Sequence, residues 1–448
     1  MRYSPKIEED LGIEVYATSS DGIGGEIRQK YEDFLVKEIP MSAEQSQNES
    51  RNDMKADYSV FWLEKRGLET ISAIKRIARE LQVSQRRFSF AGMKDRNAVT
   101  LQRVSAWKVP PEKLKEVDLR GIEITGVSKS NNPIVLGSHW GNDFTIMVRG
   151  IPLTVGTAEY RIKRISNEIK AAGGIPDFFG HQRFGLVRPI THIVGLKILR
   201  GEFKEAAMAF LSNTSPYETD EIRAARAELG TTEDFKSAMK NFPSKLTYEL
   251  CMLRKLSSSP NNFANAFRVL PRRLLQMFVS AAQGWLYNKF VSKRLKENVP
   301  LNRCLQGDLV SPLRADELVT KELVKVDLSN IDEMNRNLEY GKATVVYPVP
   351  GYDMALPIGL MRDIVKEVMT KEDLIPRSFW ISRMPEISSA GVFRQIAVTP
   401  KNLNISPVIS NSIYISKATF AFSLVRGSYG TIVLREFMKN DDPIAAGY

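Results

Sequence analysis

The sequence is poor in the residue types that most often bind metal ions. Its 448 residues include two cysteines, Cys251 and Cys304, and three histidines, His139, His181 and His192. Two cysteines cannot complete a structural zinc site by themselves, and the three histidines show none of the familiar ligand spacings. We therefore expect a protein without a metal site.

Long apolar segments are also missing from the sequence. No apolar run approaches the roughly 20 residues that a membrane-spanning helix needs, and the first residues do not resemble a secretory leader. The few cysteines give no indication of an oxidising compartment. These absences together predict a cytoplasmic protein with no membrane partner.

Hydrophobic and charged residues make up 43% and 26% of the chain, as in an ordinary folded protein. A chain of this length exceeds the size at which one hydrophobic core usually stops growing, so we expect two compartments. The excess of 63 Lys and Arg over 52 Asp and Glu gives a net charge of +11, which favours a polyanionic partner through counterion release. Charge alone leaves that partner open, because many basic proteins never bind nucleic acid.

The first third of the sequence alternates apolar and polar residues in the manner of β-strands. The stretches "DFLVKEIP" (33–40) and "YSVFWLEK" (58–65) have this period, and the polar segment 42–57 predicts a loop between them. The same alternation returns at 122–127 and 143–150. A sheet is therefore expected in this part of the chain.

Two helices are expected to pack against this sheet. Apolar residues recur every three or four positions after Thr70 and again after Thr157, and both threonines are predicted to cap a helix. The second helix is expected to stop at Gly173 and Gly174.

The sequence beyond Gly185 changes to helical patterns and then to shorter strands punctuated by proline, as in "ATVVYPVPGYDMALP" (343–357). The strand signature of the first third comes back from about Val392. The segment 419–427 alternates, and 431–439 has the pattern of a closing helix. This order indicates that the chain leaves one sheet and later rejoins it, so that its middle is an insertion.

The stretch "GMKDRNAVTLQ" contains the most distinctive candidate for chemistry. It places the acidic Asp95 between Lys94 and Arg96, shortly after Gly92. Taken alone, such a carboxylate is more often a solvated turn residue than a functional group.

The longer segment "RFSFAGMKDRNAVTLQRVSAWKV" (87–109) resembles the signature of the TruD family of tRNA pseudouridine synthases. In that family a Gly-x-Lys-Asp-x-x-Ala-Val-Thr stretch carries the catalytic aspartate, which Asp95 matches. The resemblance spans nearly the whole chain. Further segments that are similar to the family's, in the same order, are 25–40, 141–150, 174–185 with "FFGHQRFG", 280–295 and 426–437 with "RGSYG".

Two positions depart from the family's usual pattern. Asp177 and Phe178 stand where the family often has Asn-Tyr, and Gly430 stands where it usually has alanine. Neither departure touches the stretch around Asp95.

The resemblance implies an α+β fold, with a mixed, largely antiparallel sheet flanked by helices and interrupted by an α/β insertion. The implied division is a catalytic domain formed by 1–183 and 392–448, with the TRUD insertion domain at 184–391. The implied activity converts uridine to pseudouridine in tRNA, with uridine 13 as the suggested target. The target base would have to leave its stack. No cofactor, metal or obligate protein partner is implied.

The resemblance also implies a set of site residues. Asp95 would act at the ribose as a nucleophile or as a base, and both roles stay open. Such a carboxylate must be ionised although it lies buried beside a base, and Arg28 matches the basic position that pairs with it. Phe144 matches the aromatic that stacks on the target uracil. Lys94 is placed among the substrate-binding residues.

Phe34 is implied as a second aromatic of the site wall, and Asn142 as an amide near the catalytic stretch. Pattern alone favours plainer roles for several of these residues. Phe144 shares a strand face with Ile146 and Val148, which is typical of core packing. Arg28 taken alone would be a surface arginine on a strand.

The sequence leaves other functions open. An RNA-binding protein that keeps the scaffold without activity would have no need of both Asp95 and Arg28. A nuclease or glycosidase would normally show a metal-binding carboxylate cluster or a paired acid and base, which this sequence does not suggest. The block "FFGHQRFG" is expected to be mainly structural, with Arg183 as a candidate phosphate contact.

Overall fold

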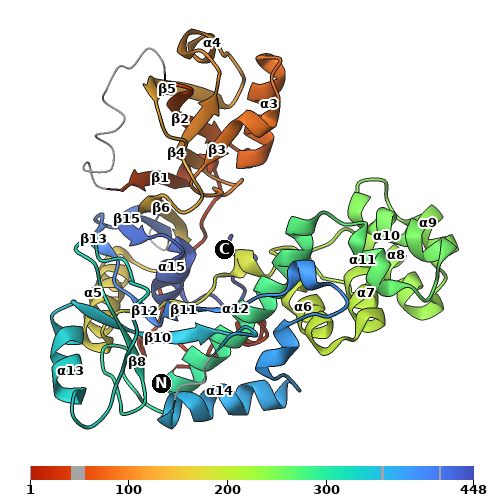
Figure 1. Cartoon of the computed structure of the whole chain (residues 1–448). Coiled ribbons are helices and arrows are strands. Elements are labelled where there is room, and N and C mark those ends of the chain that lie inside the picture. The colour runs from red at the N-terminus through yellow and green to blue at the C-terminus, as the bar shows by residue number, and fades with distance from the viewer. Residues whose placement is uncertain (1, 42–55, 355–357, 413–414) are drawn as a thin grey trace.

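The computed structural model describes residues 2–41, 56–354, 358–412 and 415–448 (Figure 1). The predicted loop 42–57 therefore lies almost entirely outside the described residues. Strands β1 (Phe34–Pro40) and β2 (Tyr58–Arg66) form on either side of it, where the alternating pattern predicts them.

The main sheet has nine strands in the order β13-β15-β6-β1-β4-β2-β5, with β14 paired to β15 and β3 to β4. The pair of β1 with β4 is parallel and the other pairs are antiparallel. The expected mixed, largely antiparallel sheet is thus confirmed. Its remaining strands are β3 (Phe88–Phe90), β4 (Val99–Trp107), β5 (Ile122–Ser130), β6 (His139–Ile151), β13 (Lys401–Ile405), β14 (Ile409–Ser412) and β15 (Ile415–Val425).

The chain leaves this sheet after β6 and returns to it with β13, β14 and β15. Phe422 of β15 pairs with Phe144 of β6, and Phe420 pairs with Ile146. The exact domain boundaries stay a prediction. A second sheet has the order β11-β10-β8-β9 and a third pairs β12 with β7; their strands are β7 (Ile175–Pro176), β8 (Leu309–Pro312), β9 (Val324–Lys325), β10 (Ala343–Val349), β11 (Val392–Gln395) and β12 (Ala397–Val398).

Helices cover the buried face of the main sheet at both ends. Helix α3 buries Ile74, Ile77 and Ala78 in one cluster with Phe61 and Leu63 of β2, as the apolar spacing predicts. The helices associated with the main sheet are α3 (Thr70–Glu80), α4 (Pro111–Lys115), α5 (Val155–Ala172) and α15 (Gly430–Met438). The short helix α1 (Lys6–Glu9) is joined to α15 by the ion pair of Glu8 with Arg435.

Neither predicted threonine cap is correct. Helix α3 begins at Thr70 with Glu69 as its cap, and the Thr70 hydroxyl instead accepts a hydrogen bond from the backbone of Lys94. Helix α5 is capped by Thr154, whose hydroxyl accepts from the backbone N–H of Thr157. The predicted stop of this helix is confirmed, because it ends at Gly173.

The middle of the chain forms a helical region around the 25-residue helix α12 (Figure 1). Helix α6 packs so closely on α12 that a Cβ at Gly195 of α6 would lie 2.0 Å from the carbonyl oxygen of Phe278 in α12. No helix in the described ranges is both long and apolar enough to cross a bilayer. The helices of this region are α6 (Thr191–Arg200), α7 (Phe203–Ser212), α8 (Asp220–Thr232), α9 (Phe235–Asn241), α10 (Thr247–Ser258), α11 (Phe263–Arg268), α12 (Arg272–Lys296) and α14 (Gly359–Lys371). Helix α13 (Ile331–Glu339) instead packs against β10 of the second sheet.

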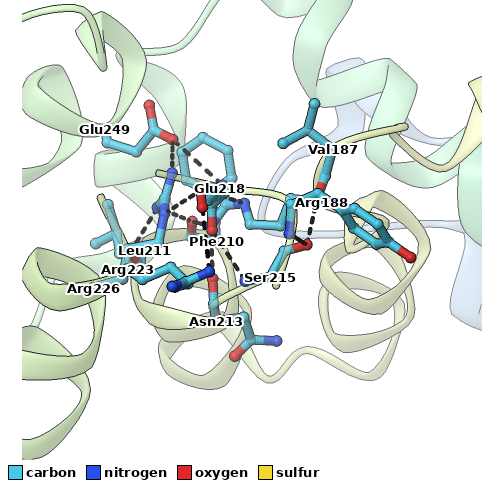
Figure 2. A network of polar contacts seen from close by, with 11 residues as sticks. Val187, Arg188, Phe210, Leu211, Asn213, Ser215, Glu218, Arg223, Arg226 and Glu249 are labelled. Atoms are coloured by element: carbon cyan, nitrogen blue, oxygen red, sulfur yellow. Dashed lines mark hydrogen bonds and ion pairs between the residues drawn. The ribbon is translucent and has the colours of Figure 1, made fainter. Parts of the chain in front are cut away.

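A buried network of charges holds the connection between α7 and α8 (Figure 2). The Arg226 guanidinium lies 2.9 Å from Glu218 and 2.8 Å from Glu249, and it also donates to the carbonyl oxygens of Phe210 and Leu211 at the end of α7. Arg188 reaches the same two glutamates. Burial, with Arg226 nearby, lowers the pKa of Arg188 to about 10. The two arginines and two glutamates therefore balance one another away from water.

Replacing Arg226 by methionine should strongly destabilise the protein. The change leaves two buried glutamates with a single arginine and frees carbonyl oxygens of α7, so the free energy of unfolding should fall by about 3–5 kcal/mol in urea denaturation. Lys204→Met, on α7, removes a side chain that is 49% exposed and pairs with Glu233 at the surface, so it should leave the free energy of unfolding close to the wild-type value. Equal losses in the two variants would contradict this account of the network.

Candidate functional site

A pocket of about 450 Å³ opens over the centre of the main sheet. Strands β1 and β6 form its floor, and residues 91–98 between β3 and β4, here called the Asp95 loop, form one wall. Segments on both sides of the insertion form the opposite wall. The residues that line the pocket are Phe34, Val36, Gly92, Met93, Lys94, Asp95, Leu136, His139, Asn142, Phe144, Phe179, Gln182, Arg183, Arg394, Gly427, Ser428, Tyr429, Gly430 and Thr431.

Asp95 forms an ion pair with Arg28 at the pocket. Arg28 Nη2 lies 2.7 Å from Asp95 Oδ2, and the Arg28 side chain is only 6% exposed. The Asp95 side chain is 41% exposed, because the open pocket gives water access to the carboxylate. Its burial beside a base concerns the occupied pocket and stays a prediction. A guanidinium on the protein side and open space on the other leave this carboxylate available to a ligand.

Arg28 is not a surface residue on a strand. Its backbone has φ +60°, a region that costs a non-glycine residue energy and is kept only where the surroundings enforce it. Arg28 Nη1 donates to the carbonyl oxygen of Gly447 at 2.9 Å, and the guanidinium lies 4.0 Å from the ring centre of Phe34. Burial lowers the pKa of Arg28 and the charge of Asp95 raises it, and a guanidinium stays charged at neutral pH.

The Asp95 loop is held from below by Lys65 of β2. The fully buried Lys65 Nζ donates to the carbonyl oxygens of Asp95 at 2.7 Å and Lys94 at 3.3 Å. Burial lowers the pKa of Lys65 to about 8, although the charge of Asp95 acts in the opposite direction. Thr70 and Gln102 complete the support, because Gln102 donates to the carbonyl oxygen of Gly92 and accepts from Thr70.

Lys94 turns away from Asp95 and pairs with Glu38, with 2.9 Å between Nζ and Oε2. Both side chains are almost completely buried, at 4% and 1% exposure. Burial and the charge of Lys94 lower the pKa of His139 to about 4, so this histidine is neutral at pH 7. Lys94 thus lines the pocket with its charge already balanced.

The aromatic residues of the site form one cluster. The Phe144 ring stacks on Phe422 at 5.5 Å between centres and meets the edge of Phe34 at 6.3 Å. Phe144 is only 7% exposed, so it belongs to the core as well as to the pocket. A Cβ at Gly430 would lie 2.8 Å from the Phe144 ring, which gives a physical reason for glycine at that position.

The Oδ1 atom of Asn142 is buried and has no hydrogen-bond partner within the described part of the chain. A buried polar atom of this kind in a pocket wall is suited to a partner on a ligand. The six residues predicted from the sequence, Asp95, Arg28, Phe34, Lys94, Asn142 and Phe144, are therefore brought together, five of them on the pocket surface and Arg28 directly behind Asp95.

The chain is similar to known proteins over nearly its whole length. The family model "tRNA pseudouridine synthase D (TruD)" matches residues 10–437. The chain belongs to the TruD family. A probable tRNA pseudouridine synthase D of Methanosarcina mazei is 36% identical over 97% of this chain and 98% of its own, and one of Pyrococcus furiosus is 34% identical over 97% and 100%. A crystal structure from M. mazei named for TruD superposes with a TM-score of 0.82 at 36% identity, covering 98% of both chains.

Sequence reasoning missed several residues that shape this TruD site. Lys65 had a signal, because it follows Phe61 and Leu63 on the inward face of a strand, where a lysine is unusual. Nothing in the sequence pointed to Gly447, because the residue that its carbonyl oxygen contacts, Arg28, is 419 residues away in the sequence. In the ranges that the structure covers, no group of three His, Cys, Asp or Glu could hold a metal ion.

Lys65 should make the free energy of unfolding depend on pH between about 8 and 10.5, and comparison with Lys65→Met isolates its share from that of the other lysines and tyrosines. Its pKa is about 8 in the folded protein and near 10.5 when unfolded, so the unfolded chain binds more protons between these values. The free energy of unfolding of the wild type should therefore rise relative to Lys65→Met by about 3 kcal/mol from pH 8 to pH 10.5.

Urea denaturation across this pH range measures the difference. Lys75→Met, at an exposed position of α3, serves as the matched control. A constant difference between wild type and Lys65→Met at every pH would contradict the lowered pKa of Lys65.

Proposed function

We propose that this TruD-family protein isomerises uridine 13 of tRNA to pseudouridine, with Asp95 as its one catalytic carboxylate and without a cofactor. The observation that carries the proposal is the ion pair between the buried Arg28 and the half-exposed Asp95 at the edge of the pocket. Family membership supplies the reaction, and the geometry supports these residues as its site.

The reaction breaks the bond between uracil N1 and ribose C1′ and forms one between uracil C5 and C1′. The proton on C5 is lost to solvent, and N1 takes up a proton, so the product is an isomer of the substrate. Arg28 holds Asp95 Oδ2 and favours the ionised carboxylate, which acts at the ribose as nucleophile or base. The detached base has to be retained while it turns. Phe34 and Phe144 offer apolar walls for it, and the amide of Asn142 offers a polar partner.

Access to the pocket requires that the target nucleotide leaves the folded RNA, because a ribose inside a stacked helix cannot approach Asp95. The net charge of +11 favours binding of the surrounding phosphates. An enzyme with this substrate would work in the cytoplasm.

A metal-dependent nuclease or a paired-carboxylate mechanism receives less support. Glu38 is near Asp95 in the fold, but it is 1% exposed and paired with Lys94. Asp143 and Glu64 line a separate hollow together with Leu35 and Leu101. Asp95 thus stands without a second carboxylate on the described surface of its pocket.

Asp95→Asn should lower the rate of pseudouridine formation by at least about 10²-fold, because the amide cannot act as nucleophile or base. Arg28→Met should also lower it strongly, and Arg28→Lys less, since lysine keeps the charge. Tritium release from carbon 5 of uridine-labelled tRNA measures the rate, and filter binding measures the affinity, which both changes should largely preserve.

Asp143→Asn provides the matched control, because this β6 aspartate accepts a hydrogen bond from Ser423 and lines the other hollow. It should leave tritium release near the wild-type rate. Full activity of Asp95→Asn would refute the site. Binding of tRNA by the wild type without any tritium release would favour the non-catalytic scaffold.

Cofactor independence and the target position have their own test. Enzyme dialysed exhaustively against EDTA should keep its full rate of tritium release, and a tRNA with cytidine in place of uridine 13 should release none. Loss of activity on dialysis that added Mg²⁺ or Zn²⁺ restores would overturn the cofactor-free mechanism. Release from the cytidine-13 tRNA would move the target to another uridine.

A further inference from the structure

The basic side chains at the pocket differ in whether their charge is balanced. Lys94 pairs with Glu38 at 2.9 Å, and Arg394 pairs with the buried Asp177 at 2.9 Å. The third basic residue on the pocket surface is Arg183, and no carboxylate among the described residues lies within ion-pair distance of it. One cation at the pocket is therefore left without an anion.

Arg183 is held in place by contacts that do not neutralise it. It ends the short 3-10 helix η4 (His181–Arg183), its Nη1 lies 3.4 Å from Ser280 Oγ of α12, and its guanidinium lies 5.4 Å from the ring centre of Phe179. Its Nε atom is buried without a partner. A desolvated donor on an uncompensated cation costs free energy unless a ligand satisfies it.

The ring that Arg183 contacts is itself fixed. Phe179 exchanges two backbone hydrogen bonds with the side chain of Asn288, at 2.8 and 3.1 Å, and Arg394 lies 4.5 Å from its ring centre. Arg183 therefore projects from a rigid wall that faces the Asp95 loop across the pocket. Such a preorganised guanidinium is suited to a phosphate, which it can bind through two parallel N–H donors.

We propose that Arg183 binds a backbone phosphate next to the extruded target nucleotide. This inference rests on the proposed function, because an RNA substrate brings one phosphate on each side of the nucleoside that enters the pocket. The Asp95 carboxylate would then meet the ribose while Arg183 fixes the adjoining backbone from the opposite wall. Arg183 is in this sense a substrate-binding residue.

Salt dependence of tRNA binding distinguishes a phosphate contact from a structural brace. Arg183→Met keeps an apolar stem against Phe179 and removes the charge. We expect its affinity for tRNA to fall about tenfold at low salt, and the slope of log K against log salt concentration to become shallower by about one. Arg183→Lys should recover most of the slope.

A modified substrate locates the contact. Methylphosphonate linkages, which carry no charge, are placed singly on the 5′ or the 3′ side of the target uridine. One of the two should weaken binding to the wild type about tenfold and leave binding to Arg183→Met unchanged, because the partner of that phosphate is already gone.

An unchanged salt slope for Arg183→Met, or an equal methylphosphonate effect in wild type and variant, would overturn the proposal and leave Arg183 as a brace for Phe179. Circular dichroism checks that each variant is folded, and Arg183→Lys supplies the comparison if the methionine variant is not. Both readouts need binding only, so they remain informative even if the wild type releases no tritium and the proposed function fails.

Discussion

The site depends on one buried cation. Arg28 is almost wholly removed from water, and its guanidinium is committed to Asp95 on one edge and to the Gly447 carbonyl on another. A buried guanidinium without these acceptors would be very unfavourable, so the three segments that meet there must fold together. The backbone of Arg28 has a positive φ, and these contacts hold it in that strained conformation.

Much of the fold could be predicted from periodicity, because the strands and helices of the main sheet bury one face each. The alternation in β1, β2 and β6 and the apolar stripe of α3 are such patterns. The residues that cap the helices were harder to predict. Thr70 has the side chain of a typical helix cap, yet its hydroxyl accepts a hydrogen bond from the backbone N–H of Lys94 in the Asp95 loop instead. A tertiary contact of this kind leaves no trace in a local pattern.

The site could be predicted only in its motif-bearing part. Asp95, Arg28 and the aromatic residues could be placed by resemblance, whereas the supports of the Asp95 loop come from β2, α3 and β4, each distant in sequence. The exposure of Asp95 was also beyond prediction, because it depends on how far the two walls of the pocket stand apart. Lys65 shows that a charge on an apolar strand face deserves functional scrutiny.

The pairing of β15 with β6 affects how the protein folds during its synthesis. Ser423 and Asp143, which face one another in this pair, are separated by 280 residues. During synthesis the edge of β6 that pairs with β15 stays unpaired until the whole insertion has left the ribosome. Contacts so distant in sequence also slow folding. A nascent chain would therefore carry an unpaired strand edge and an incomplete pocket for most of its synthesis, and it could not act on RNA before the last strand is in place.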